Sequence, residues 1–475
     1  MSMKKEVLDI VTKSFSEAPG STGNSLIAYN LENTISVLYP DTTRFAKDIT
    51  RVFGGYGRSA EFDVVTKNAS DEQRGMTERG KTGSVNRLLK KRYSQTYHSF
   101  GRSGTVVLQD ELDHGPLTPE RKALEVNGMM HSHARNMERL IIGGNSSSSL
   151  VKPVVTGTVS SGGTITAGSY DVQVVSLNYQ AYVETRYKSI TDITVPATKT
   201  MTDVYGNVTE TNFGHSLPSD AVSVTTTTTN KTINATWPID PNAFGYLVFA
   251  GATGSVKLQA LVFVNAITLT SLVTNTVNVS TVDTTEDRSV EIGAIDGVLT
   301  QVLKANSGAT VNYLTAGATL SKGSRNNCVE IDALLTDMWQ KKMIEPSKMY
   351  MSPKVFTQLA DTMGDSLVRF NVNGNGDGKV VLGSTVNMYI HPATGHYIEI
   401  ISALEFPDVI LFVQPNTTYG QGGDTVTYEL DYRVAPRVNF WPIMEYEQKF
   451  SILEDLCVKV KYPGAFGLIG NIKTN

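Results

Sequence analysis

Two histidines separated by one residue, His131 and His133, form the pattern in this chain that most resembles a pair of metal ligands. On a strand the two rings would share one face and could bind a single metal ion. On a helix, positions i and i+2 point about 200° apart, and the sequence around this pair has helical spacing. We therefore predict no metal site at these histidines.

Residues 371–378 place asparagine and aspartate oxygens at alternate positions, as calcium loops do, but the glutamate that completes such a loop is missing downstream. A glycine-rich turn is the preferred interpretation. The glycine groups at 54–57 and 420–423 match neither a dinucleotide fingerprint nor a phosphate loop, and no GxSxG motif is present. No catalytic residue, cofactor-binding residue or cofactor is predicted, and the chain is expected not to be an enzyme.

Other titratable residues have ordinary interpretations. His391 and His396 flank a turn and are expected on the surface, and Glu454 with Asp455 is expected on a solvated face. The two cysteines, Cys328 and Cys457, lie far apart without chelating neighbours, so they are expected to be reduced and buried.

The strongest local signal for a binding surface is a basic segment at residues 74–92, in a chain whose formal net charge is -4. Its charged residues include one acid, Glu78, and seven bases: Arg74, Arg79, Lys81, Arg87, Lys90, Lys91 and Arg92. The flanks at 62–65 and 93–100 are typical of strands, which predicts a two-stranded hairpin that is marginal alone. The preferred hypothesis is an intersubunit contact on acidic surface of a neighbouring copy; a solvated loop tip and a nucleic-acid contact stay open.

Composition and hydropathy argue against two other kinds of partner, nucleic acid and membrane. A net charge of -4 over 475 residues argues against nonspecific nucleic-acid binding by the whole chain. The amino-terminal residues lack an uninterrupted apolar run, and the longest apolar stretch, 261–273, is broken by Asn265. It is shorter than the ~20 residues of a membrane span. We therefore expect a soluble product without a membrane partner.

Stop and start signals divide the chain. Thr118 and Pro119 predict the beginning of a long helix, and Gly143 with Gly144 predicts its end. We expect an amino-terminal arm at 1–48, an extended hairpin loop at 49–112 and a spine helix with the start of a peripheral domain at 113–150. An inserted all-β domain follows at 151–288, then an axial domain with part of the peripheral domain at 289–435, and peripheral strands at 436–475.

The inserted domain, called the cassette below, is predicted from composition. Residues 151–285 hold 27 threonines in 135 positions, too many β-branched polar residues for helices. The stretch from Trp237 to Phe249 resembles the central strands of fibronectin type III or immunoglobulin-like modules. Strands are predicted at 169–176, 221–227, 232–237, 245–250 and 255–264.

Beyond residue 292 the pattern becomes mixed. It predicts helices at 293–305, 329–343 and 353–363, a strand at 348–351, and mostly strands to the end. The cassette thus interrupts one domain, and the predicted fold class is α+β.

Three stretches in the last third resemble the major capsid fold of tailed bacteriophages, which encapsulins and the herpesvirus capsid floor share. One is a strand, Ser-Pro and helix with Asp361 and Gly364 at 348–364. The next is the passage from Gly383 to Pro392 with a strand at 408–412, and the last is the closing strand and Pro-x-Ala-Phe tail at 458–470. Their order, behind an arm, a hairpin and a spine helix, carries the resemblance over about 1–150 and 290–475.

The resemblance implies a shell subunit that packs into hexamers and pentamers of identical copies, forming an icosahedral head around double-stranded DNA. The DNA would touch the inner face nonspecifically. A separate scaffolding protein and a portal are implied, and a decoration protein is left open. The subunit would assemble in the host bacterial cytoplasm and reside in the virion capsid.

Some members of this family are crosslinked through a loop lysine, and Lys81, Lys90 or Lys91 could offer the amine, but no crosslink is predicted here. Two alternatives remain: an encapsulin-like cargo shell, and a glycan-binding or adhesion protein that uses the cassette.

Overall fold

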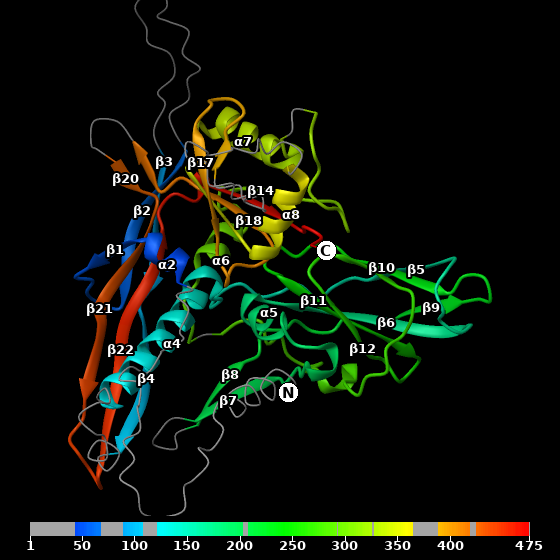
Figure 1. Cartoon of the computed structure of the whole chain (residues 1–475), viewed down its shortest axis with the longest axis horizontal. Coiled ribbons are helices and arrows are strands. Elements are labelled where there is room, and N and C mark those ends of the chain that lie inside the picture. The colour runs from blue at the N-terminus through cyan, green and yellow to red at the C-terminus, as the bar shows by residue number, and fades with distance from the viewer. Residues whose placement is uncertain are drawn as a thin grey trace, which may run out of the picture.

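The computed structural model describes residues 43–67, 89–107, 121–202, 208–291, 293–324, 327–363, 388–418 and 424–474. Helices and strands alternate irregularly along these residues, as expected for a mixed α and β fold. Figure 1 shows a tall sheet beside a long helix, a compact mixed part above them, and a β-rich part that extends to the opposite side. Most of the predicted amino-terminal arm, the calcium-like stretch at 371–378 and the glycine group at 420–423 lie outside the described residues.

The tall sheet has four strands in the order β1 (Thr50–Phe53), β21 (Tyr428–Phe440), β22 (Glu447–Val460) and β4 (His98–Val107). β1 runs parallel to β21, and the other neighbouring strands are antiparallel. Side chains alternate along β21, so that Leu430 and Tyr432 enter the main hydrophobic core while Glu429 and Asp431 face the other side.

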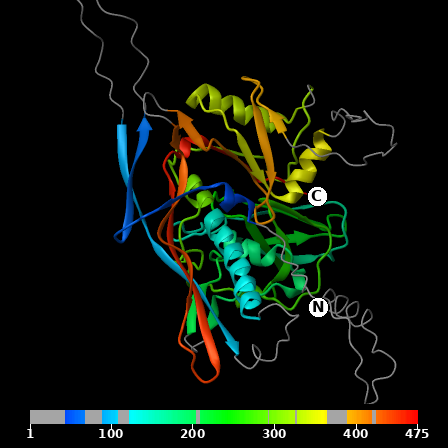
Figure 2. The same cartoon turned by 60° about the vertical axis from the view of Figure 1, so that its left-hand side comes forward.

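The predicted spine helix is α4 (Arg121–Gly143), which lies along the core side of the tall sheet (Figure 2). Ile141 and Ile142 are buried in the same core as Leu456 of β22. The helix ends at the predicted glycine stop. Position 144 requires glycine, because a Cβ atom there would clash with the carbonyl oxygen of Ile295. The predicted start at 118–120 lies outside the described residues. At 1.5 Å per residue, the 23 residues make a rod of about 34 Å.

The short helix α2 (Arg44–Asp48) attaches the described end of the amino-terminal arm to the spine helix. The carboxylate of Glu138 accepts hydrogen bonds from the backbone N–H groups of Phe45 and Ala46 at 2.9 and 2.8 Å. The Phe45 ring is fully buried and meets the ring of Tyr350 edge-on at 4.9 Å. This part of the arm is therefore part of the core.

The compact mixed part is a six-stranded sheet with helices packed on it. Helices α7 (Val329–Lys342) and α8 (Pro353–Met363) and the strand β15 (Lys348–Met351) confirm the predictions for these segments. The strand order is β14 (Thr310–Tyr313), β23 (Phe466–Gly470), β18 (Ile410–Val413), β15, β17 (Tyr397–Ser402) and β16 (Met388–Ile390). A small pair, β19 (Asn416–Thr418) with β20 (Asp424–Val426), joins this sheet to the tall one.

The helix predicted at 293–305 is shorter, so that prediction was too long. It is α6 (Val298–Leu303), with Gly297 as its N-cap. The preceding turn is held by Asp296, whose carboxylate accepts hydrogen bonds from Ser146, Ser147 and Lys304. The contacts with Ser146 and Ser147 join segments about 150 positions apart in the chain, and together with Lys304 they hold Asp296 in a turn that precedes the helix.

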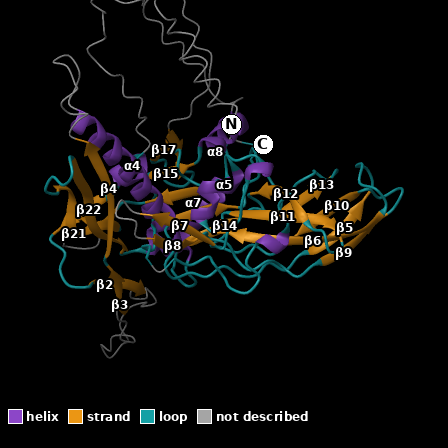
Figure 3. Cartoon of the chain, turned by 90° about the horizontal axis from the view of Figure 1, so that it is seen from below, coloured by secondary structure: helices purple, strands orange, loops and turns teal. Residues whose placement is uncertain are grey.

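The predicted cassette consists mainly of strands, as Figure 3 shows at the end away from the tall sheet. One sheet has the order β12 (Lys257–Val262), β11 (Gly245–Ala252), β6 (Gly168–Leu177) and β9 (Val222–Thr226). A second has the order β13 (Ala266–Leu269), β10 (Thr232–Thr236) and β5 (Thr156–Ser160), and β7 (Thr198–Thr202) pairs with β8 (Val208–Asn212). All five predicted strands are present, whereas the immunoglobulin-like assignment is not confirmed and stays a prediction, as do the domain boundaries.

The cassette is attached to the rest of the chain at two levels. Its two connections meet, because the side-chain amide of Asn145 donates to the carbonyl of Ser289 at 2.9 Å and the N–H of Glu291 donates to the carbonyl of Asn145 at 2.9 Å. In addition, α5 (Tyr179–Thr185) buries Tyr179 and Tyr182 in the main core beside α4. Part of the cassette sequence therefore belongs to the main hydrophobic core, which lies between the tall sheet and the compact mixed part (together called the body below).

Candidate assembly interface

The predicted hairpin is formed by β2 (Ser59–Lys67) and β3 (Leu89–Thr96), and no third strand pairs with either of them within the described ranges. Figure 2 shows the two strands standing beside the tall sheet, with their far ends directed away from the body. Side chains at 61, 63 and 90–94 are exposed. The described part of the hairpin is thus left unburied by its own chain. Since a lone two-stranded ribbon is marginal in water, it would gain stability from a contact with another molecule.

The structure places three of the seven predicted contact residues, Lys90, Lys91 and Arg92, as exposed side chains on β3. The other four lie outside the described residues, and the structure does not test whether any of the seven contacts a partner. These four are Arg74, Arg79, Lys81 and Arg87.

The three described cations differ in their surroundings. Arg92 is used within the hairpin, since its Nε donates to Oδ1 of Asp63 at 3.0 Å, and this bond lowers the pKa of the Asp63 carboxyl. The Nζ of Lys91 lies 5.1 Å from the centre of the Tyr93 ring. In the described part of the chain no ion pair engages Lys90 or Lys91. Among the described residues of β3, those two lysines are cations that the hairpin can offer to another molecule.

Tyr97, the residue between β3 and β4, anchors the hairpin to the tall sheet. Its hydroxyl donates a 2.7 Å hydrogen bond to Oδ2 of Asp431, and its ring is buried with Ala60 and Cys457. Burial and the adjacent carboxylate raise the pKa of Tyr97 far above its ordinary value, so the hydroxyl remains a donor at neutral pH. Gly55 runs so close to this ring that a side chain at that position would clash with it.

A charged layer lies beneath this anchor, on the side of the tall sheet opposite α4. Lys459 forms ion pairs with Glu429 and Asp431, and the Nζ of Lys461 lies 2.6 Å from Oε2 of Glu429. Both carboxylates are buried and each has a cation as partner. Because its charges are internally matched, this layer orients the hairpin and does not provide a binding surface.

The end of β21 and the turn that leads to β22, residues 440–446, form a second exposed surface, called the apolar tip below. Met444 and Tyr446 are 69% and 77% exposed, and Glu445 and Tyr446 adopt positive φ values of 50° and 62° that reverse the chain. A group of exposed large apolar side chains marks a protein interaction site. The exposed apolar residues of the tip are Phe440, Trp441, Ile443, Met444 and Tyr446.

The sequence analysis missed the apolar tip. The signal was present, because residues 440–446 place five large apolar side chains at the end of one strand and in the turn that follows, where polar turn residues are usual.

The candidate metal histidines lie on α4, where they do not share a face. His131 is exposed, whereas His133 is buried with its Nε2 2.8 Å from Oε1 of Glu454. Among the described residues no group of three or more His, Cys, Asp or Glu side chains is arranged to bind a metal ion.

The prediction that Glu454 and Asp455 form a solvated face was wrong. Both are buried, and they point to opposite sides of β22: Glu454 toward His133 of α4, and Asp455 toward Arg433 and Ser99. Adjacent strand residues alternate between faces, and both faces of this strand are covered.

The prediction of a surface position was also wrong for His391. Its ring is buried, and its Nδ1 accepts hydrogen bonds from the N–H groups of Ala393 and Thr394 at 3.2 and 3.3 Å. Burial lowers the pKa of His391, in agreement with a neutral ring that accepts these bonds. His396, in contrast, is exposed as predicted.

The cysteine prediction was confirmed. Cys328 and Cys457 are free and buried, and burial raises the pKa of each thiol to about 12. Separately, none of the helices in the described ranges combines the length and the apolar character that a membrane span requires.

Comparisons with known proteins give matches among solved structures only. No family model and no curated protein matches the chain. In fold, the chain is similar to the capsid of the native GTA particle, with 10% identity and a TM-score of 0.43 over 97% of this chain and 100% of that one. It is also similar to the capsid of cyanophage A-1(L), with 9% identity and a TM-score of 0.43 over 94% and 97%. The match to the SrpI encapsulin of Synechococcus elongatus is partial, with 14% identity and a TM-score of 0.24 over 38% and 57%.

Proposed function

We propose that this chain is the major capsid protein of a tailed bacteriophage. In this proposal identical copies form hexamers and pentamers, close into an icosahedral head and enclose double-stranded DNA, with a separate scaffolding protein and a portal as further partners. The role is structural and not enzymatic, and the mature location is the virion capsid.

The observation that carries the proposal is that one copy leaves two separate surfaces unburied. The hairpin β2–β3 has no third strand within the described residues, and the apolar tip exposes five large side chains. Two different surfaces that each need a partner favour heterologous contacts, which close into rings when the rotation between copies allows it. Many modest contacts of this kind, repeated over a shell, stabilise it through multivalency.

Two of the three stretches that carry the resemblance form the expected elements within the described residues, whereas Gly364 and residues 383–387 lie outside them. β15 leads through Ser352 and Pro353 into α8, and the Ser352 hydroxyl donates to Oδ1 of Asp408 at 2.6 Å. At the carboxyl end, β22 is followed by the 3-10 turn Pro463–Ala465 and by β23, which enters the six-stranded sheet beside β18.

The test is production of the full chain in bacteria, with and without a candidate scaffolding protein, followed by sedimentation and negative-stain electron microscopy. Closed shells of uniform size are the expected result. A chain that stays monomeric in both cases contradicts the proposal. Shells that package a protein cargo instead of DNA would favour the encapsulin-like alternative.

A further inference from the structure

Glu405, in the connection between β17 and β18, is fully buried and receives three arginines from two helical segments. Its Oε1 lies 2.7 Å from Nε of Arg135, and its Oε2 lies 3.0 Å from Nε of Arg139 and 2.7 Å from Nη2 of Arg186. Arg135 and Arg139 come from α4, and Arg186 follows α5. We call these four residues the arginine cluster.

The arginine cluster carries a surplus of two positive charges. Arginine stays protonated at all ordinary pH values. Burial alone would raise the pKa of Glu405, but the hydrogen bonds from Arg139 and Arg135 hold it below the ordinary glutamate value, so the carboxylate is charged as well. Within the described residues no second carboxylate forms an ion pair with Arg135, Arg139 or Arg186. One negative charge therefore faces three positive ones.

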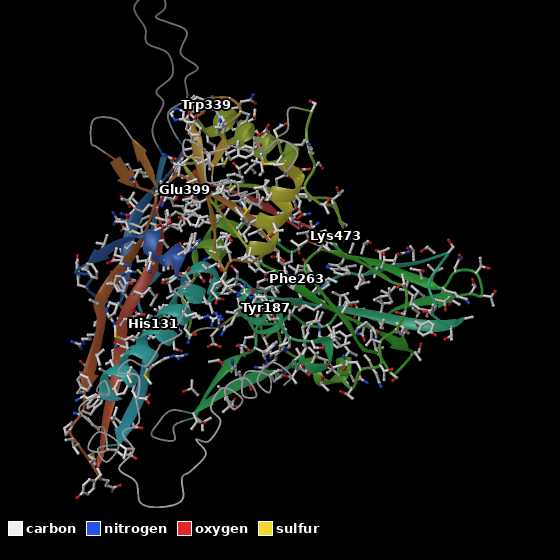
Figure 4. All side chains as sticks on the ribbon, viewed as in Figure 1. His131, Tyr187, Phe263, Trp339, Glu399 and Lys473 are labelled. Atoms are coloured by element: carbon white, nitrogen blue, oxygen red, sulfur yellow. The ribbon has the colours of Figure 1, made fainter. Side chains whose placement is uncertain are left out.

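The three arginines are not equally enclosed. The Arg186 side chain is 4% exposed, and its Nε has no hydrogen-bond partner. Its guanidinium lies 4.6 Å from the centre of the Tyr187 ring. The side chains of Arg135 and Arg139 are 45% and 31% exposed. Figure 4 labels His131, which lies one helical turn before Arg135 on α4, and Tyr187, which follows Arg186 in the chain. Arg135 and Arg139 are therefore the accessible members of the cluster.

The geometry suits a phosphate group. Arg135 and Arg139 are four positions apart on one helix, so their Cβ atoms lie about 5–6 Å apart on the same face. A guanidinium presents a rigid fork of donors that matches phosphate oxygens. Because Glu405 already fixes both side chains, a ligand would not have to order them, which favours binding through preorganisation.

We propose that Arg135 and Arg139 bind a phosphate group, and that this phosphate belongs to the backbone of the enclosed DNA. The second half of the inference rests on the proposed function. It assigns the DNA contact to α4, while Lys90 and Lys91 are left to contacts between copies. A local contact of this kind is sequence-independent and depends on salt, because each neutralised phosphate releases bound counterions.

The test measures binding of a short fluorescent DNA duplex to the unassembled full chain by anisotropy, over a series of salt concentrations. Arg135→Gln is expected to reduce the slope of log K against log salt by about 0.9, the value for one phosphate contact. Arg135→Lys, which keeps the charge, should retain most of that slope. Arg437→Gln, which removes an exposed arginine of β21, is the matched control and should leave the slope unchanged.

Glu405→Gln separates an anion site from a purely structural cluster. Glutamine keeps a carbonyl oxygen that accepts hydrogen bonds from the arginines and holds them in place, while the negative charge is lost. This variant should therefore bind the duplex several-fold more tightly even though it melts at a lower temperature. A purely structural cluster would lose stability without any gain in DNA binding.

Besides the absence of a binding gain in Glu405→Gln, three results would overturn the proposal. The first is an unchanged salt slope in folded Arg135→Gln. The second is loss of shell formation in that variant with unchanged duplex binding, which would make the cluster a protein interface. The third is a site that binds inorganic phosphate while duplex binding ignores the substitution. Because the assay uses unassembled subunits, a failure of shell assembly in the wild-type chain would be seen separately by microscopy.

Discussion

The hydroxyl of Tyr97 donates a hydrogen bond of 2.7 Å to Asp431, a residue 334 positions further along the chain. Tyr97 stands where β3 ends and β4 begins, so this bond joins the base of the exposed hairpin to a central strand of the tall sheet. The direction in which the hairpin leaves the body is fixed at this point.

Tyr97→Phe should reduce the free energy of unfolding by about 1–3 kcal/mol, because a hydrogen bond to a charged, buried acceptor is lost. Urea denaturation followed by circular dichroism measures this change. Tyr93→Phe, at an exposed tyrosine of the same hairpin, is the control and should stay within about 0.5 kcal/mol of the wild type. Equal effects of the two substitutions would contradict the anchoring role of Tyr97.

Lys90→Glu combined with Lys91→Glu should prevent or strongly reduce shell formation while the subunit stays folded. These exposed lysines have no ion pair within the described residues, so reversal of their charge acts mainly on a partner. Arg92→Gln is the matched control on the same strand, with a smaller expected effect because Arg92 is engaged by Asp63. Particle yield is counted by electron microscopy after sedimentation. Normal shells from the double variant would refute the proposed contact.

Met444→Ser combined with Tyr446→Ser should lower particle yield without a change in melting temperature. Both side chains are exposed in one copy, so their replacement removes little stability from the isolated subunit. They would matter only where a neighbouring copy covers the apolar tip. Val154→Ser in the cassette, at another exposed apolar residue, is the control. A yield equal to that of the control would show that the tip is not part of an interface.

Glu405 should make the stability of the subunit depend on acidity. Its pKa is lowered in the folded state, so it stabilises the fold above the ordinary glutamate value of about 4.3, and this contribution is lost as the pH falls through the folded-state value. Glu405→Gln should therefore melt below the wild type at neutral pH, and the two melting temperatures should converge in acid. Glu399→Gln, an exposed carboxylate on β17, is the control. A constant difference at all pH values would contradict this assignment.

Local signals predicted the elements that local chemistry determines. Ser352 and Pro353 mark the start of α8 because serine caps a helix and proline fits its first position, and the glycines at 143 and 144 end α4. The strands of the cassette were predicted from the threonine content of this region and from the turn residues between them. In each case the relevant residues are neighbours in the sequence.

Contacts between distant segments were not predictable in the same way. The burial of Glu454 and Asp455 depends on coverage of both faces of β22, which no local pattern records. The arginine cluster brings Arg135 and Arg186 to Glu405 from 270 and 219 positions away, and none of these residues stands out in the sequence. The basic segment was visible from its charge alone, but the charge does not reveal which lysines lack a partner inside the hairpin.

The hydrogen bonds among Asn145, Ser289 and Glu291 bring the two connections of the cassette together. A foreign domain with adjacent termini could thus be grafted at this junction without stretching the parent scaffold. The graft would have to keep Tyr179 and Tyr182. If the whole cassette were removed, these two rings would be lost and cavities would remain in the main hydrophobic core.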